Sequence, residues 1–149
     1  MKFLNLYSRC LSAVMIFIAC AGSGTVLGID NPDSPDLVAQ FKERAKVHEK
    51  IINNPDLPNV ALISVYADYQ RFLDEELNKA YRGLRAELAE PQKQALKISQ
   101  QNWLKFRDAE FKFINDNWVR ENFGSSVYLS RGMYKSTIIE NRVLHLLYY

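Results

Sequence analysis

Residues 62–88, LISVYADYQRFLDEELNKAYRGLRAEL, decide the fold class of this chain. Apolar residues recur there at steps of three and four, namely at Leu62, Tyr66, Tyr69, Leu73, Leu77, Ala80, Leu84 and Leu88. Such steps put side chains on one face of an α-helix, whereas a strand would bury every second position. The spacing predicts one long amphipathic helix over residues 60–89, capped by Asn59. Gly83 lies inside it, where a missing side chain would permit a close helix contact.

A second long helical pattern begins after the break at Glu90-Pro91 and extends to about Trp118. Proline suits the first turn of a helix, where the N–H that it lacks would have no partner. The apolar stripe of this helix comprises Leu96, Trp103, Phe106, Phe113 and Ile114, with Leu104 and Phe111 beside it. A short turn between two long helices makes them antiparallel neighbours, so we expect their apolar faces to pack together.

Shorter helical patterns flank this hairpin. Ser34-Pro35-Asp36 is typical of a helix start, with Ser34 as the cap and Pro35 in the first helical position. The stripe that follows is Leu37, Phe41, Ala45, His48 and Ile52, before Asn53, Asn54, Pro55 and Pro58 end the helix. Near the C-terminus, Gly124-Ser125-Ser126 and Gly132 bound a looser segment. The last helix then carries Met133, Thr137, Ile138, Asn141, Leu144 and Leu147.

The predicted fold is therefore all-α. It is a bundle of three to four helices built on a long antiparallel helical hairpin, and residues 34–149 form a single helical domain. Aromatic residues at helical spacing are more often core than a cofactor site.

Residues 1–28 have the pattern of a secretory signal peptide. Lys2 and Arg9 precede a short apolar run at residues 11–19, and small residues follow it. That run is shorter than the ~20 residues that span a bilayer. We therefore expect an exported protein that is periplasmic or attached to the envelope by a lipid.

Two processing routes are open. Phe17-Ile18-Ala19-Cys20 resembles a lipobox, which would give a lipoprotein signal over residues 1–19 and a lipidated Cys20, although Phe17 stands where Leu is usual. Ordinary cleavage after Ala21 or Gly28 is the alternative. Residues 21–35 are rich in Gly, Ser, Asp and Pro, a composition that suits a tether.

Charge and cysteine content exclude several function classes. Removing Lys2 and Arg9 from the 19 basic residues leaves 17, equal to the number of acidic residues. A neutral domain has no basic face for nucleic acid, and membrane contact is expected only through the leader or a lipid anchor. Both cysteines, Cys10 and Cys20, lie in the leader, so the mature domain has neither a disulfide nor a thiolate ligand.

The sequence offers no catalytic constellation. His48 and His145 fall on different predicted helices, whereas metal ligands usually cluster. The chain has no nucleophile elbow, phosphate-binding loop or dinucleotide fingerprint. Asp74-Glu75-Glu76 is most simply a solvated helix face. We predict no catalytic residue, cofactor or metal, and a protein that is not an enzyme.

One polar cluster interrupts an apolar stripe. Gln100, Trp103, Arg107 and Glu110 follow at steps of three, four and three, so they share one face of the helix. Asn78 lies at the edge of the facing helix. We predict a cluster of Asn78, Gln100, Arg107 and Glu110 between the two long helices. A role in helix register is favoured over ligand binding, because buried polar groups can specify pairing.

The same region carries a family resemblance. Its motif is an acid followed by Leu-Asn-x-x-Tyr, then Leu-x-x-x-Gln-x-x-Trp-x-x-Phe-Arg-Asp. The matching residues are Asp74, Leu77, Asn78, Tyr81, Leu96, Gln100, Trp103, Phe106, Arg107 and Asp108, with a looser match at Arg142 and Leu146. Over residues 60–147 the chain resembles the LprI-like lysozyme-inhibitor N-terminal-domain family.

The resemblance implies a secreted or lipid-anchored helical domain, with lysozyme inhibition as the activity associated with the founding member. The family usually has one cysteine just after the Arg-Asp motif and another in the last helix. Phe111 and Tyr134 occupy those positions here, so packing of two aromatic rings would replace a disulfide.

We therefore expect an envelope protein that binds a protein partner and inhibits lysozyme or another cell-wall hydrolase. An acidic surface could meet such a cationic enzyme. The candidate acids are Asp74, Glu75, Glu76, Glu87 and Glu90. Two alternatives are a non-inhibitory structural or assembly component of the envelope, and a small-molecule binder that uses a gap between the long helices.

Overall fold

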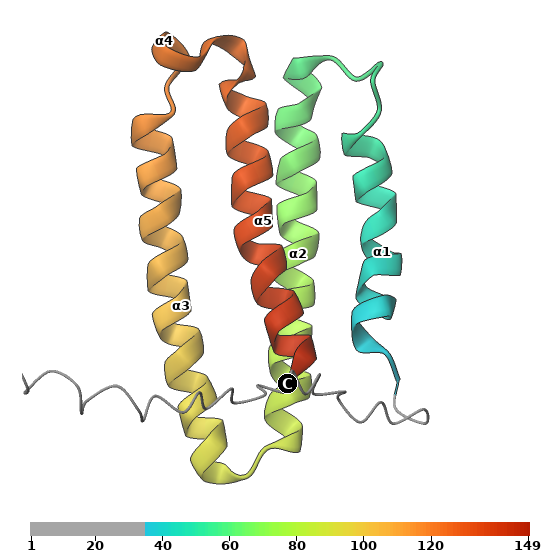
Figure 1. Cartoon of the computed structure of the whole chain (residues 1–149), viewed down its shortest axis with the longest axis vertical. Coiled ribbons are helices and arrows are strands. Elements are labelled where there is room, and N and C mark those ends of the chain that lie inside the picture. The colour runs from blue at the N-terminus through green and yellow to red at the C-terminus, as the bar shows by residue number, and fades with distance from the viewer. Residues whose placement is uncertain (1–34) are drawn as a thin grey trace, which may run out of the picture. The chain divides into compact units, whose positions relative to one another are not determined.

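Antiparallel helices make up residues 35–149, the part of the chain that the computed structural model describes (Figure 1). In chain order they are α1 (Leu37–Ile52), α2 (Asn59–Glu87), α3 (Glu90–Asn117), α4 (Arg120–Phe123), the 3-10 turn η1 (Gly124–Ser126) and α5 (Val127–Tyr148). The predicted all-α bundle is confirmed. The predicted signal peptide and the candidate lipidation site Cys20 lie outside the described residues. Within residues 35–149, no helix is both long and apolar enough to span a bilayer.

The helix starts differ from the predicted caps. Asp36, rather than Ser34, caps α1, because its Oδ1 accepts a hydrogen bond of 2.7 Å from the backbone N–H of Ala39. Pro35 thus lies before the helix. α2 begins at Asn59 itself, after Pro58 in extended conformation, and no side chain caps it. The predicted cap at Asn59 is therefore wrong.

The closest helix pair is α2 with α5, two elements that are far apart in the sequence. α1 packs on α2, and α3 packs on α5 (Figure 1). α2 and α3 do form the expected antiparallel hairpin around Leu88 and Ala89. Their backbones do not approach each other as α2 and α5 do, so the expectation that their apolar faces pack mainly on each other is wrong. α5 takes the place that the sequence suggested for α3.

The core joins one face of α2 to one face of α5, with contributions from α1 and α3. Its buried members are Phe41, Ala45, Tyr69, Leu73, Leu77, Ala80, Leu96, Ile139, Val143 and Leu146. The stripe predicted for α2 is confirmed, because its first six members are buried and Leu84 and Leu88 pack at its edge.

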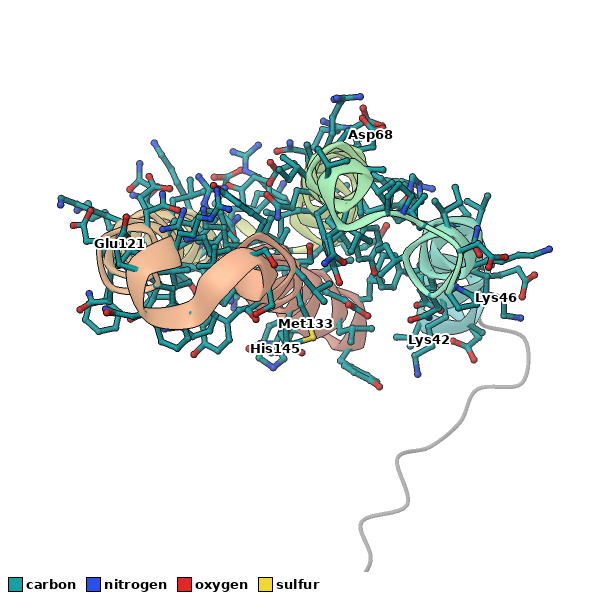
Figure 2. All side chains as sticks on the ribbon, turned by 90° about the horizontal axis from the view of Figure 1, so that it is seen from above. Lys42, Lys46, Asp68, Glu121, Met133 and His145 are labelled. Atoms are coloured by element: carbon teal, nitrogen blue, oxygen red, sulfur yellow. The ribbon has the colours of Figure 1, made fainter. Side chains whose placement is uncertain are left out.

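The stripe predicted for α5 is only partly correct. Met133, Thr137 and Asn141 are exposed, whereas Leu144 and Leu147 pack against the core. Met133 and His145 lie on the side of the bundle opposite to Asp68 of α2 (Figure 2). The residues that face the core are instead Gly132, Ser136, Ile139, Val143 and Leu146, at steps of four, three, four and three.

Small residues explain the close approach of α5 to α2. Gly132 lies inside α5 rather than in a loop, and a Cβ built there would lie 2.5 Å from Tyr66 Cδ2 and 2.8 Å from Tyr66 Cβ. The distance between two packed helices depends on the side chains at the contact, so a glycine shortens it. Gly83, where the sequence suggested such a contact, has no atom within 4 Å of a built Cβ.

α3 buries only a narrow stripe because it packs mainly on α5. Leu96 and Ile114 are buried, and Trp103 and Phe111 lie at the edge of the core. Phe106 and Phe113 were predicted to be in the stripe, but they are 51% and 59% exposed.

Candidate functional site

Trp103 of α3 is the centre of a polar and aromatic network that joins three helices. The Cζ atom of Arg107 lies 5.5 Å from the centroid of the indole ring, and that of Arg142 lies 5.9 Å from it. Cations at such distances are attracted by the electron-rich ring face. We call Asp74, Gln100, Trp103, Arg107 and Arg142 the Trp103 cluster.

Arg142 ties α5 to α3. It is buried, and its Nε donates to Gln100 Oε1 at 3.0 Å while its Nη2 donates to Ser99 Oγ at 3.1 Å. Both acceptors are neutral, and burial lowers the pKa of the guanidinium from its ordinary value. A buried cation usually has an anionic partner, so this one relies on hydrogen bonds and on the Trp103 ring.

Arg107 ties α3 to α2. Its Nη1 lies 3.5 Å from Asp74 Oδ1, and its Nε and Nη2 donate to Asp108 Oδ1 at 3.0 and 2.8 Å. Its Cζ lies 5.9 Å from the centroid of Phe111. Burial raises the pKa of Asp74, and the charge of Arg107 opposes that rise. Arg107 thus compensates part of the cost of burying this carboxylate.

The structure brings together only two of the four residues of the predicted polar cluster. Gln100 and Arg107 both belong to the Trp103 cluster, through different partners. Asn78 is exposed, and its Nδ2 donates to the backbone carbonyl of Asp74 at 2.8 Å. Glu110 is partly exposed, and among the described residues its side chain makes no hydrogen bond or ion pair.

Sequence reasoning left Arg142 out of the cluster. Two features of the sequence could have indicated it. Arg142 belongs to the looser family match at the C-terminal end, and it is a charged residue next to the apolar Val143. The other family-motif residues have structural positions. Leu77 and Leu96 are in the core, Tyr81 lies at its edge, Phe106 is exposed, and Asp108 is an exposed partner of Arg107.

The run Asp74-Glu75-Glu76 is not the solvated face that the sequence suggested. Glu76 is 9% exposed, and Arg44 of α1 holds it with Nε to Oε1 at 2.9 Å and Nη2 to Oε2 at 2.5 Å. Asp74 faces Arg107. Of the three, only Glu75 falls among the exposed residues, because α1 and α3 each supply a cation to one of its neighbours.

Exposed acids remain at the turn between α2 and α3, at the lower end of Figure 1. Glu87 is exposed, and the side chain of Glu90 is 85% exposed and lies 3.6 Å from Lys93 Nζ. Leu88 between them packs against the core, which anchors the turn. We call residues 87–91 the α2–α3 tip.

The two histidines do not meet. His48 stacks on Phe72 and Tyr69, with ring centroids 4.6 and 5.5 Å apart, at the contact between α1 and α2. His145 is exposed on α5. Within residues 35–149 there is no group of three or more His, Cys, Asp or Glu residues that could hold a metal ion.

Phe111 and Tyr134 do not stack on each other as a substitute for a disulfide. Tyr134 meets Trp118 edge-on, with centroids 5.3 Å apart, and no Phe111–Tyr134 pair occurs among the ring contacts of the described helices. Phe111 instead contacts α5 through Lys135, whose Nζ lies 5.2 Å from its ring centroid.

A model of the family described as lysozyme inhibitor LprI matches residues 58–146. This span runs from the start of α2 almost to the end of α5 and contains the whole Trp103 cluster and the α2–α3 tip. No curated protein and no solved structure matches the chain.

Proposed function

Because the chain belongs to the LprI lysozyme-inhibitor family, we propose that it is an exported envelope protein that binds and inhibits a lysozyme-type cell-wall hydrolase. The family match over most of the helical domain is the observation that carries this proposal. The lack of a metal-ligand cluster among the described residues is compatible with a binding role.

The α2–α3 tip is the surface that fits such an inhibitor best. An inhibitor must occlude the substrate cleft, which requires a projecting element, and the tip joins the ends of the two longest helices. Pro91 in the first turn of α3 and the packed side chain of Leu88 hold it in one conformation. A preordered tip loses little conformational entropy on binding.

Charge favours the same surface. Asp74 and Glu76 already face arginines of this chain, so they are poor candidates for contact with a partner. Glu87 is exposed, and Glu90 keeps 85% of its side chain exposed despite its 3.6 Å contact with Lys93, so both would meet a cationic enzyme with opposite charge. A domain without net charge gives little long-range steering, so the attraction must be local.

The test measures lysis of a cell-wall suspension by lysozyme with excess purified protein. We expect the parent chain to inhibit, and the double variant Glu87→Lys/Glu90→Lys to need about tenfold more protein for the same inhibition. The matched control is Asp56→Lys/Glu121→Lys, which changes the charge equally at the opposite end of the bundle (Figure 1).

The outcomes separate the two parts of the proposal. Full lysozyme activity in the presence of the parent chain would refute inhibition. If the tip variant inhibits as well as the parent chain, the protein is an inhibitor, but it contacts lysozyme through a surface other than the α2–α3 tip.

Export is proposed from residues 1–28. The intact mass of the protein recovered from the envelope distinguishes an acylated Cys20 from a chain that begins at Gly22 or at Ile29. An intact mass that still includes Met1 would refute processing.

A further inference from the structure

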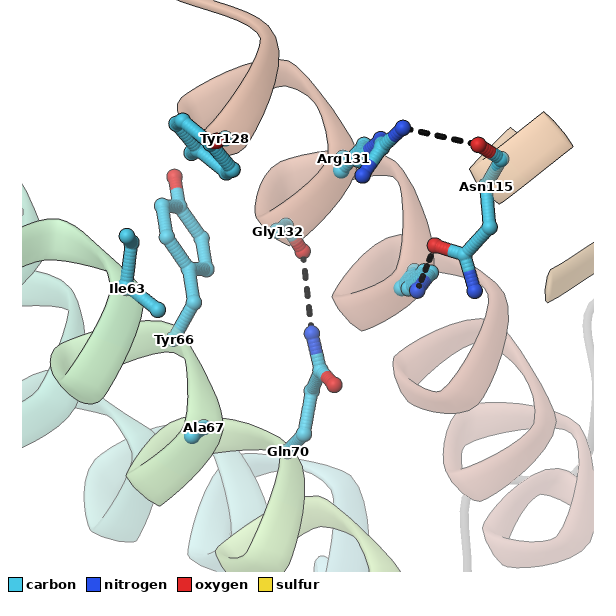
Figure 3. A pocket seen from close by; sticks show the side chains of 9 residues that line it. Ile63, Tyr66, Ala67, Gln70, Asn115, Tyr128, Arg131 and Gly132 are labelled. Carbon is cyan, nitrogen blue, oxygen red and sulfur yellow. Dashed lines mark hydrogen bonds between the residues drawn. The ribbon is translucent and has the colours of Figure 1, made fainter. Parts of the chain in front are cut away.

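A cavity of about 180 Å³ opens between α2 and α5 beside the C-terminal part of α3 (Figure 3). Its lining includes two tyrosines, Tyr66 and Tyr128, two cations, Arg131 and Lys135, and the amide of Asn115. Tyr128 and Asn115 are exposed, so the cavity is accessible from solvent. It lies near the end of the bundle opposite to the α2–α3 tip, so it is separate from the proposed inhibitory surface (Figure 1).

The two cations of the cavity have only neutral partners. Arg131 Nη2 donates to the backbone carbonyl of Asn115 at 2.7 Å, and Lys135 Nζ donates to Asn115 Oδ1 at 2.8 Å. No Asp or Glu lines the cavity, and within residues 35–149 neither cation forms an ion pair. Arg44 and Arg107 each have a carboxylate partner, whereas Arg142, which also has only neutral partners, does not line the cavity.

The charge of Arg131 makes the protonated form of Lys135 less favourable. Burial and the charge of Arg131 lower the pKa of Lys135 from its ordinary value. The Nε atom of Arg131 is buried and has no hydrogen-bond partner. Two neighbouring cations without a carboxylate favour a bound anion, which would relieve their repulsion.

The aromatic side of the cavity indicates which group is attached to the anionic group of the ligand. Tyr66 and Tyr128 lie together on one side, and Arg131 and Asn115 lie on the other (Figure 3). Flat rings favour stacking with a flat apolar group. An enclosed cavity of ~150 Å³ can hold a benzene molecule, so the volume of this open cavity is sufficient for a single ring with a carboxylate attached.

We propose that the cavity binds a small organic carboxylate with a flat apolar body. The carboxylate accepts hydrogen bonds from Arg131 and Lys135, and the apolar body lies against Tyr66 and Tyr128. Planar guanidinium and carboxylate groups match each other in geometry, which favours a carboxylate over a spherical anion.

Benzoate is the probe for this site. It is titrated into the full ¹⁵N-labelled chain, and we expect saturable shifts of the Gly132 and Lys135 amides with a dissociation constant in the millimolar range. Benzamide has the same ring without the charge, and we expect its affinity to be lower than that of benzoate by a factor of about ten or more. Lys135→Met should weaken benzoate by a similar factor, whereas Lys105→Met, which removes an exposed lysine of α3, should leave it unchanged.

Three results would overturn the assignment. They are the absence of saturable shifts at Gly132 and Lys135, equal binding of benzamide and benzoate, and inorganic phosphate that binds as tightly as benzoate. The comparison of benzoate, benzamide and phosphate uses the unaltered protein, so it stands even if a variant does not fold.

Discussion

Gly132 of α5 lies directly against the ring of Tyr66 of α2. A Cβ at position 132 would meet the Cβ, Cγ and Cδ2 atoms of the tyrosine; its Cβ is fixed to the backbone, and its ring is buried and has little room to rotate away. We expect Gly132→Ala to lower the free energy of unfolding by about 1–3 kcal/mol, because overpacking forces a core to shift. The measurement is urea denaturation followed by circular dichroism.

Gly83→Ala is the matched control. A Cβ there meets no atom within 4 Å, and the position is inside α2. Alanine should therefore stabilise the protein by about 0.5–1 kcal/mol, the difference in helix propensity between the two residues. A Gly132→Ala variant that gains stability as Gly83→Ala does would show that the contact between α2 and α5 is not tight.

Phe113 and Ile114 are neighbours that test which face of α3 is buried. Ile114 is 1% exposed, so Ile114→Ala should cost about 2–5 kcal/mol of stability. Phe113 is 59% exposed, so Phe113→Ala should change stability by about 0.5 kcal/mol or less. The midpoints of thermal unfolding give the order. A larger loss at Phe113 would mean that α3 is rotated or that its outer face is covered.

Arg44 and Glu76 form the ion pair between α1 and α2. Arg44→Met leaves the carboxylate of Glu76 buried without its two hydrogen bonds, and we expect a loss of about 1–3 kcal/mol. Arg71→Met is the control, because Arg71 and Asp68 form an exposed pair that should contribute about 0.5 kcal/mol or less. Denaturant unfolding compares both variants with the parent. Similar losses in the free energy of unfolding would show that the buried pair contributes no more to stability than the exposed one.

Glu140 should make stability depend on pH. Burial raises the pKa of its carboxyl group, while the Tyr69 hydroxyl, which donates to it at 3.3 Å, opposes that rise. The folded state therefore holds the proton more tightly than the unfolded state. The resulting stability is complete below the ordinary pKa of the group and is lost as the pH rises through its raised value.

Glu140→Gln removes this dependence and keeps an acceptor for Tyr69. At about pH 7 we expect the variant to be more stable than the parent, and the gain should disappear near about pH 4. Glu121→Gln changes an exposed carboxylate and should show no such trend. A gain that is constant across this range would remove ionisation of Glu140 as the cause.

Arg107 tests whether the Trp103 cluster sets the register of α3, as we propose. Arg107→Leu leaves Asp74 without its cation, and we expect a loss of about 0.5–1.5 kcal/mol. Adding Asp74→Asn should recover part of it, because the uncompensated charge is removed. Inhibition of lysozyme by the folded fraction should not change. Loss of inhibition without loss of stability would assign the cluster to partner binding instead.

How well the buried face of each helix could be predicted depends on how many of its sides pack against other helices. α2 was predicted well because its apolar residues occupy one face and that face is buried. α5 was misread because α2 and α3 contact it on two sides, and Gly132 and Ser136 at the contact have little hydrophobic signal. Small residues indicate a close helix contact only when the partner helix is known.

The Trp103 cluster was half predicted for a similar reason. Gln100 and Arg107 share a helical face with Trp103, which spacing can show. Arg142 comes from another helix, and no spacing relates it to the others. Nothing in the sequence indicated the cavity. Arg131 and Lys135 are distinguished by the lack of a nearby carboxylate, and this can be seen only in the folded domain.

The position of α5 also determines when this protein can fold. The helix that packs most closely on α2 is separated from it in the sequence by the whole length of α3. Before Val127–Tyr148 docks, α2 can bury only part of its apolar stripe, against α1, and closing so long a loop costs entropy before any contact repays it. We therefore expect the docking of α5 on α2 to be the step that limits how fast this domain folds.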